Sequence, residues 1–297
     1  MLTTAETILT PRVNVKPYNV QMNETSLDIL KLVFEFKIAT AWQITRFLKQ
    51  RDRVKYIYLK LHRMWQAGLL ESFKVFTGSR AGMPVYYMLS KSGLKVLGEY
   101  GHYDKDALKN YPPIRALLSS GMFKHEAQVV ELASQEILNK TSDLHITFTG
   151  ETKSQTREYR SDKHIEVLTP DYTAFYTVGN QTERIFTEFE RTNKTHVAML
   201  KKIDRYIKHL TPDGFKNTTL RLIFQTSGME TAFWRNLCLE KPQFNQHIRI
   251  LTTHLSLLGN RERFSEAIYA SFNTIGLVRE GRVFAKVESR IKLFSFL

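Results

Sequence analysis

The sequence TPDYTAFYTVGNQTERIFTEFERT, residues 169–192, predicts two β-strands joined by a tight turn. Residues 171–176 and 183–191 are rich in β-branched and aromatic side chains, as strands are. Gly179 and Asn180 between them are typical of a two-residue hairpin turn. We therefore expect a β-hairpin here.

The hairpin would gather carboxylates on one face. Residues two apart on a strand share a face, so Glu188 and Glu190 project together, and Asp171 can reach them if the strands pair. Three carboxylates repel one another unless a cation lies between them, and hard ions such as Mg²⁺ or Mn²⁺ take oxygen ligands of this kind. Such a metal could activate water and neutralise a phosphate oxyanion. The alternative is a hairpin whose solvated face is acidic.

The bulk composition favours a polyanionic partner. A net charge of +14 and a pI near 9.7 suit nucleic acid or an anionic membrane surface. No apolar run approaches the roughly 18 residues of a membrane span, and the first residues lack signal-peptide features. The single cysteine, Cys238, excludes an internal disulfide and a cysteine zinc site. We expect a soluble cytoplasmic protein that binds nucleic acid.

The first hundred residues follow the element order of a winged helix-turn-helix. We expect helix, helix, helix, strand, strand and helix at residues 27–38, 41–48, 52–67, 69–76, 85–89 and 91–100. Thr25 or Ser26, then Thr40 and Ser90, are the expected N-caps. The third helix would enter the major groove, and the hairpin would act as the wing on the DNA backbone.

A run of basic residues between Arg46 and Arg63, the basic stripe, supports DNA binding by this domain. Asp52 is the single acidic residue within the stripe, and Arg80 lies at the wing tip. The candidate DNA contacts are Arg46, Lys49, Arg51, Arg53, Lys55, Lys60, Arg63 and Arg80. The alternative is a solvated basic helix pair in a winged helix that binds protein.

The remaining chain alternates strands and helices, which predicts an α/β domain with a mixed sheet. Further helices are expected at 125–139, 196–210, 230–240 and 256–272, with strands at 144–149, 220–225 and 247–252 and an edge strand and basic tail within 282–297. The predicted fold class of the whole chain is α+β. The predicted parts are an extended arm at 1–22, the winged helix-turn-helix at 23–100, a linker at 101–121 and the second domain at 122–297.

Pro170-Asp171 and Glu188-Phe189-Glu190 on a hairpin between two helices resemble the core of restriction-endonuclease-like PD-(D/E)xK nucleases. In that family the aspartate and the first acid of the second motif hold the metal, which implies Asp171 and Glu188 here. Lysine usually stands where this chain has Glu190. Some restriction enzymes carry glutamate there and still cleave.

The wider pattern resembles the replication-relaxation family, which includes MOBC-type conjugative relaxases, over residues 25–210. The positions that match the family's motifs are His125, Glu126, Pro170, Asp171, Glu188, Glu190, Arg191, Lys202 and Tyr206. The resemblance implies an origin-like site on double-stranded DNA as the partner. Other mobilization proteins and a second copy of the chain are further candidate partners.

The resemblance also implies roles, each with an alternative. Glu190 is a third ligand or the group that orients water. Lys202 supplies the positive charge that Glu190 does not, or is a solvated lysine. Tyr206, four residues on, is a covalent nucleophile or a packed tyrosine.

Three further positions are weaker candidates. Glu126 adds a carboxylate to the site or stabilises a helix N-terminus. His125 is a base or a capping residue. Arg191 clamps a phosphate or has a structural role.

Three functions remain open at this point. The first is a metal-dependent nickase acting at a transfer origin with Mg²⁺ or Mn²⁺. The second is a DNA-binding accessory or regulatory protein whose nuclease-like domain is inactive. The third is a replication initiator that melts DNA without cutting it.

Overall fold

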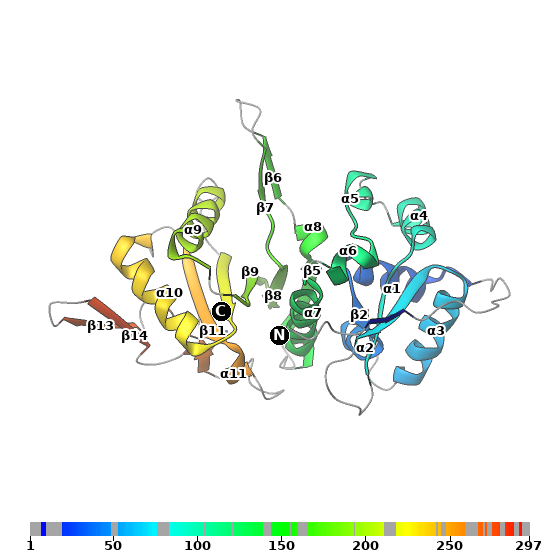
Figure 1. Cartoon of the computed structure of the whole chain (residues 1–297), viewed down its shortest axis with the longest axis horizontal. Coiled ribbons are helices and arrows are strands. Elements are labelled where there is room, and N and C mark those ends of the chain that lie inside the picture. Colours follow the sequence, from blue (N-terminus) through cyan, green and yellow to red (C-terminus); the bar gives the residue numbers. More distant parts are fainter. Residues whose placement is uncertain are drawn as a thin grey trace. The chain divides into compact units, whose positions relative to one another are not determined.

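The structure, a computed structural model, forms two compact units, residues 1–134 and 135–297, each described here on its own (Figure 1). The described residues are 7–9, 20–48, 53–75, 83–101, 103, 105–119, 121–138, 144–154, 156–159, 165–192, 194–210, 218–241, 243–244, 248–258, 267–269, 271, 275–279, 283–287 and 291–292. Helices and mixed sheet give the predicted α+β class. Every helix among these residues is too short or too polar to traverse a bilayer.

The first unit has the predicted winged-helix order. Its elements are α1 (Glu24–Glu35), β2 (Ala39–Thr40), α2 (Ala41–Phe47), α3 (Val54–Gln66), β3 (Leu70–Val75), β4 (Val85–Leu89) and α4 (Lys91–Tyr100). The sheet order is β1-β3-β4-β2, with β3 and β4 antiparallel as a wing requires. The extra strand β1 (Thr7–Leu9), which pairs with β3, lies within the stretch predicted as an extended arm.

Side-chain caps fix the helix starts. Thr40 and Gln43 form a reciprocal capping box, and Ser90 Oγ accepts from Gly93 N at 3.1 Å, so both predicted caps are confirmed. The prediction of Thr25 or Ser26 for α1 is wrong. Asn23 Oδ1 accepts from Ser26 N at 3.1 Å, because α1 begins at Glu24, two or three residues earlier than those choices require.

The stretch 101–121, predicted as a linker, is packed into the first unit. It carries α5 (Lys105–Lys109) and α6 (Ile114–Ser119). Between them the Tyr111 hydroxyl donates to Lys37 O at 2.6 Å and accepts from Leu89 N at 3.0 Å. These buried contacts tie the segment to the winged helix.

The division between the units falls inside α7 (Phe123–Leu138), further along the chain than the predicted start at 122. The reason is that the first turns of α7 pack on the first unit. The Phe123 ring lies edge-on to Phe73 and Tyr86, with ring centroids 5.8 and 4.9 Å away. Lys37 Nζ also lies 2.7 Å from Glu126 Oε1.

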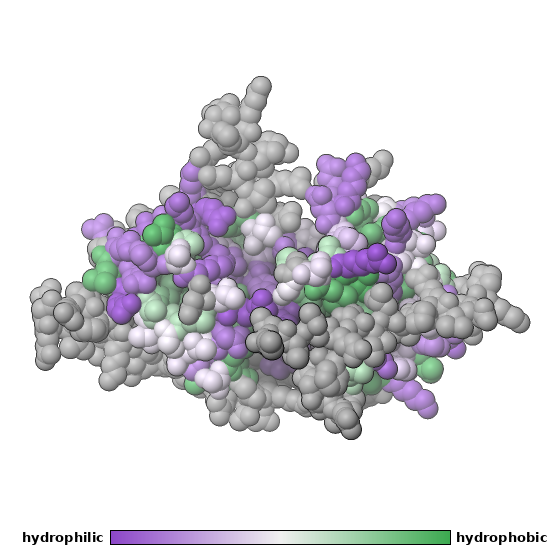
Figure 2. Space-filling view, viewed as in Figure 1, coloured by the Kyte–Doolittle hydropathy of each residue, from purple (hydrophilic) through white to green (hydrophobic). Residues whose placement is uncertain are grey.

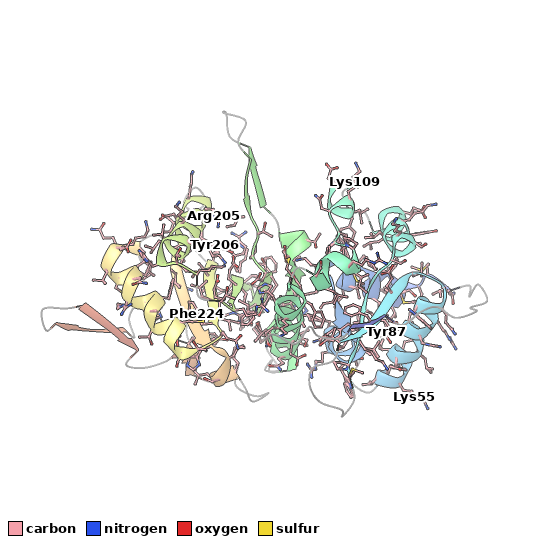
Figure 3. All side chains as sticks on the ribbon, viewed as in Figure 1. Lys55, Tyr87, Lys109, Arg205, Tyr206 and Phe224 are labelled. Atoms are coloured by element: carbon pink, nitrogen blue, oxygen red, sulfur yellow. The ribbon has the colours of Figure 1, made fainter. Side chains whose placement is uncertain are left out.

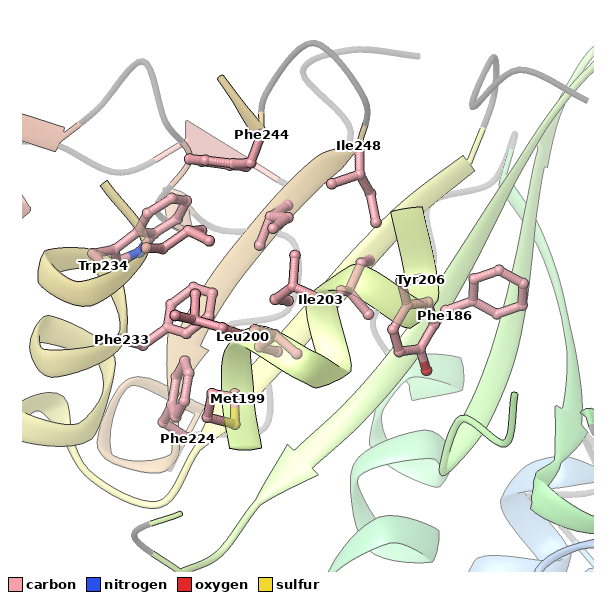
Figure 4. Close-up of a cluster of buried hydrophobic side chains, with 14 of the residues drawn as sticks. Phe186, Met199, Leu200, Ile203, Tyr206, Phe224, Phe233, Trp234, Phe244 and Ile248 are labelled. Carbon is pink, nitrogen blue, oxygen red and sulfur yellow. The ribbon is translucent and has the colours of Figure 1, made fainter. Parts of the chain in front are cut away.

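The second unit is built on a five-stranded mixed sheet, as predicted. Its order is β11-β10-β9-β8-β5, where β5 is Leu144–Gly150, β8 is Tyr172–Val178, β9 is Gln181–Glu190, β10 is Thr218–Phe224 and β11 is Arg249–His254. Strands β9, β10 and β11 run parallel, and β5, β8 and β9 run antiparallel. Helices α9 (His196–Leu210) and α10 (Ser227–Glu240) cover one face, where they share an aromatic core with the strands (Figure 4).

The opposite face of this sheet holds a buried ion pair. Arg221 on β10 is fully buried and is paired with Glu136 on α7. Tyr172 and Tyr176 donate their hydroxyls to the Glu136 carboxylate. Arg221 Nη2 donates to Thr187 Oγ1 at 2.8 Å, so the network links three strands to the helix.

The periphery differs from the predictions. Helix α8 (Glu151–Ser154) and the hairpin of β6 (Thr156–Tyr159) and β7 (Ile165–Leu168) were not predicted. The helix predicted over 256–272 is wrong, because α11 spans only Leu255–Leu258 and β12 (Ala267–Tyr269) pairs with β15 (Ile291–Lys292). Strand β14 (Val283–Val287) pairs with β13 (Ile275–Arg279), and the basic tail beyond residue 292 lies outside the described residues.

Candidate active site on the β8–β9 hairpin

The hairpin predicted from residues 169–192 is present. Strands β8 and β9 pair from Tyr172↔Thr187 to Val178↔Gln181, which leaves Gly179-Asn180 as the turn. Gly179 has φ +57°, a left-handed conformation that glycine adopts without steric penalty. The register fixes which side chains of the two strands lie side by side.

The predicted alternation along β9 is also present. Glu188 contacts α9, whereas Thr187 next to it contacts Arg221 on the opposite face. Asp171 immediately precedes β8, and its Oδ2 accepts from Phe189 N at 2.6 Å. The Asp171 charge helps to raise the pKa of Glu188, so the two carboxylates are electrostatic neighbours.

Lys202 on α9 lies between the two glutamates of the motif. Its Nζ is 2.8 Å from Glu188 Oε2 and 2.5 Å from Glu190 Oε1, with the side chain only 14% exposed. Lys194 Nζ lies 2.8 Å from Glu190 Oε2 and forms an ion pair with it. The geometry of this contact is not that of a hydrogen bond, so Glu190 Oε2 has no hydrogen-bond partner. Two ammonium groups thus compensate Glu188 and Glu190, and Lys202 is turned to the sheet.

Tyr206, one helical turn after Lys202, completes the contacts of Glu188. Its hydroxyl donates to Glu188 Oε1 at 2.6 Å, and its ring packs beside Phe186 with centroids 5.8 Å apart (Figure 4). Burial raises the pKa of Tyr206 well above its usual range, and the Glu188 charge adds to this. Tyr206 is thus a packed, protonated tyrosine in this structure, and its role as a nucleophile stays a prediction.

The pKa values of Glu188 and Lys202 are set by burial and by neighbouring charges. Burial raises the pKa of Glu188 to about 7, against the opposing effect of the Lys202 charge. Burial lowers the pKa of Lys202, but Glu188 and Glu190 outweigh it and raise the pKa above the ordinary value. Lys202 therefore stays charged at neutral pH, while Glu188 can exchange a proton there.

The carboxylates are suitable donors for a divalent ion, but they do not form a ready three-ligand site. Among the described residues, no group of three or more His, Cys, Asp and Glu is arranged to hold a metal. Lys202 stands between Glu188 and Glu190. A carboxylate oxygen can accept more than one contact, so Asp171 and Glu188 keep coordination capacity.

A small pocket adjoins the carboxylate face. It measures about 60 Å³ and lies at the carboxyl ends of β9 and β10, against the first turns of α9 and α10. Glu190, Lys194, Met199, Phe224, Met229 and Phe233 are among the residues that line it. The buried Glu190 carboxylate therefore faces a space of solvent size. Lys194 was missed from the sequence, although its position four residues after Glu190 was a usable signal.

The three weaker candidates, Glu126, His125 and Arg191, have other surroundings than the carboxylates of the hairpin. Glu126 is buried in the first unit and paired with Lys37, which satisfies it without a metal. His125 lies half-buried beside it in α7. Arg191 directly follows β9 and is half-buried.

The basic stripe of the winged helix separates into three groups. Arg46 is held internally, with Nη1 2.8 Å from Glu131 Oε1 and 3.1 Å from Ser134 Oγ, and Lys60 Nζ donates to Asn23 Oδ1 at 2.7 Å. Exposed on or beside α3 are Arg53, Lys55 and Arg63 (Lys55 in Figure 3). Outside the described residues lie Lys49, Arg51 and Arg80. For the exposed group, contact with DNA phosphates stays a prediction.

Hydrophilic residues also cover α5 and the outward side of α9 (Figure 2).

The family model described as replication-relaxation matches residues 30–220 of the chain. The match spans the winged helix from α1 onward and the β8–β9 hairpin with α9. No curated protein and no solved structure matches.

Proposed function

Since the chain belongs to the replication-relaxation family, we propose that it is a DNA-binding, metal-dependent endonuclease that nicks one strand at a plasmid or mobile-element transfer origin. The family ties the chain to replication or mobilization and so to DNA. Strand cleavage, the metal and the origin-like site are the finer parts of the proposal.

One observation carries the proposal: the β8–β9 hairpin and α9 bring Asp171, Glu188, Glu190 and Lys202 together on one sheet face. Acidic groups beside a buried cation suit phosphodiester chemistry. Carboxylates can bind a metal and direct water, and an ammonium can hold a phosphate. The exposed basic face of α3 supplies a means of holding duplex DNA.

Each residue then has a defined task. Mg²⁺ or Mn²⁺, held by Asp171 and Glu188, would supply an activated water and neutralise phosphate charge. The Phe189 N–H fixes the Asp171 carboxylate, and the Tyr206 hydroxyl fixes that of Glu188. Lys202, always charged at neutral pH, is placed to move from the glutamates to a phosphate oxygen.

A second function is favoured by the same lysine. Lys202 and Lys194 already compensate Glu188 and Glu190, so the two glutamates have cationic partners from the chain itself. This arrangement suits a DNA-binding accessory or regulatory protein whose nuclease-like domain is inactive. The nicking experiment separates the two functions.

The test uses supercoiled plasmid carrying the DNA that flanks the protein's own gene. With Mn²⁺ we expect nicked circles, and with excess chelator we expect none. Because Glu188 must be ionised to bind a metal and its raised pKa is about 7, the nicking rate should rise as pH increases through 7. Gel densitometry of the open-circular band over a pH series measures both effects.

The control is the same plasmid without the flanking DNA, which should be nicked more slowly. Specific retardation of the cognate DNA with no nicking in Mn²⁺ or Mg²⁺ at any pH would establish the accessory function instead. Nicking that persists in chelator would remove the metal from the proposal.

A further inference from the structure

We propose that the winged helix holds one unstacked base of single-stranded DNA in an aromatic pocket between α3 and the β3–β4 hairpin. The pocket measures about 210 Å³. This is below the roughly 300–1,000 Å³ of sites for drug-sized ligands and suits a single planar ring. The inference rests on the DNA binding of the proposed function and adds an unpaired strand to what the domain recognises.

One wall of the pocket is a stripe of α3. Tyr58, His62 and Trp65 line it and follow the i, i+4, i+7 spacing of one helix face. Tyr58 is 52% exposed, so much of its ring is open to solvent. The His62 and Trp65 ring centroids lie 5.5 Å apart, and the two rings are tilted by 31°. Flat rings presented in this way are platforms on which a base can stack.

The other wall is the face of the β3–β4 hairpin that carries Ser72 and Tyr87. Ser72 pairs with Tyr87 and Lys74 pairs with Val85, and all four line the pocket. Tyr87 (labelled in Figure 3) is buried, and burial together with the nearby Tyr58 raises its pKa to about 12. The Tyr87 hydroxyl therefore stays protonated and can donate a hydrogen bond.

The domain's own packing buries Tyr87 but leaves Tyr58 and His62 exposed. Strand alternation sends Phe73 and Tyr86 to the opposite face of the hairpin, where they pack against Phe123. That face, α1 and the Ile57, Leu61 and Met64 side of α3 contribute to the core of the unit. The pocket side is instead left open between the helix and the wing strands.

Charge selects a nucleotide as the occupant. Among the described residues that line the pocket none is a carboxylate, and Lys74 adds a cation to its wall. Lys55 and Arg63 are exposed on the same helix. An aromatic slot in a basic surface fits a base with its phosphates outside, whereas an acidic rim would have suited a basic peptide.

The test measures the anisotropy of a labelled oligothymidylate of about 12 nucleotides. Tyr58→Ala should weaken its binding about tenfold, which is the loss of one stacked base. Tyr58→Phe keeps the ring and should stay within about twofold of the parent. Because Tyr58 is half-exposed, neither change should shift the thermal unfolding midpoint, which is measured alongside.

Tyr56→Ala is the matched control. Tyr56 lies on the same helix and is 44% exposed, but it is not part of the pocket lining, so its replacement should leave oligothymidylate binding within about twofold. Equal losses for both alanine variants, or no loss for Tyr58→Ala, would overturn the pocket while leaving duplex binding by the parent protein intact. A parent protein that binds neither duplex nor single strand would instead refute the proposed DNA binding, and the pocket with it.

Discussion

Replacing Glu188 by glutamine should lower the rate of strand nicking about 1,000-fold and leave duplex affinity unchanged. The amide keeps the shape that Tyr206 and Lys202 contact at 2.6 and 2.8 Å, but it cannot carry the negative charge that a metal requires. Its neutral form also resembles the protonated Glu188 below its raised pKa. Nicking should therefore be lost without a change in fold, as single-turnover rates on cognate plasmid would measure.

Glu183→Gln is the matched control for this experiment. Glu183 is a buried carboxylate on the same strand β9, but it contacts Thr219 at 2.6 Å and Arg249 at 3.1 Å and not α9. Its replacement should leave the nicking rate within about threefold of the parent. Equal activity of Glu188→Gln and the parent, or equal losses in the two variants, would remove Glu188 from the chemistry.

Replacing Arg221 by leucine should destabilise the protein by about 3–5 kcal/mol, because it leaves the Glu136 charge buried without its partner. The double replacement Arg221→Leu/Glu136→Leu should be less destabilising than the single one, since no uncompensated charge remains. Chemical denaturation followed by far-ultraviolet circular dichroism gives the free energies of unfolding.

A second arginine–glutamate pair provides the comparison. Arg249 pairs with Glu183 at 3.1 Å, but the Arg249 side chain is 39% exposed and Glu183 keeps its hydrogen bond from Thr219, so Arg249→Leu should cost less than Arg221→Leu. If Arg221→Leu and Arg249→Leu have the same small effect, the buried network does not hold the strands to α7.

Local patterns predicted the parts of the fold that are local in origin. The alternation of Phe186, Glu188 and Glu190 fixed the face of β9, and Gly179-Asn180 fixed the turn. Both depend on neighbouring residues alone. The winged-helix order was predictable for the same reason, because helical spacing and the Thr40 and Ser90 caps lie within single elements.

The ion pairs between different helices and strands were not predictable, because they join residues that are separated in the chain. Arg46 looked like a DNA contact until the fold placed Glu131 beside it, and Glu126 looked like a ligand until the fold paired it with Lys37. The same holds for Lys202. Its distance in sequence from Glu188 and Glu190 could not show that its ammonium lies between their carboxylates. Sequence supplies the charges, and only the tertiary register decides their partners.

The most direct test of the proposed active site is a crystal of the protein soaked in Mn²⁺ and examined by anomalous scattering. We predict a manganese peak about 2.1 Å from carboxylate oxygens of Asp171 and Glu188. Lys202 should then be displaced from at least one of the glutamates that it bridges. A map without a peak at saturating Mn²⁺, with Lys202 still between Glu188 and Glu190, would contradict the metal-dependent nuclease.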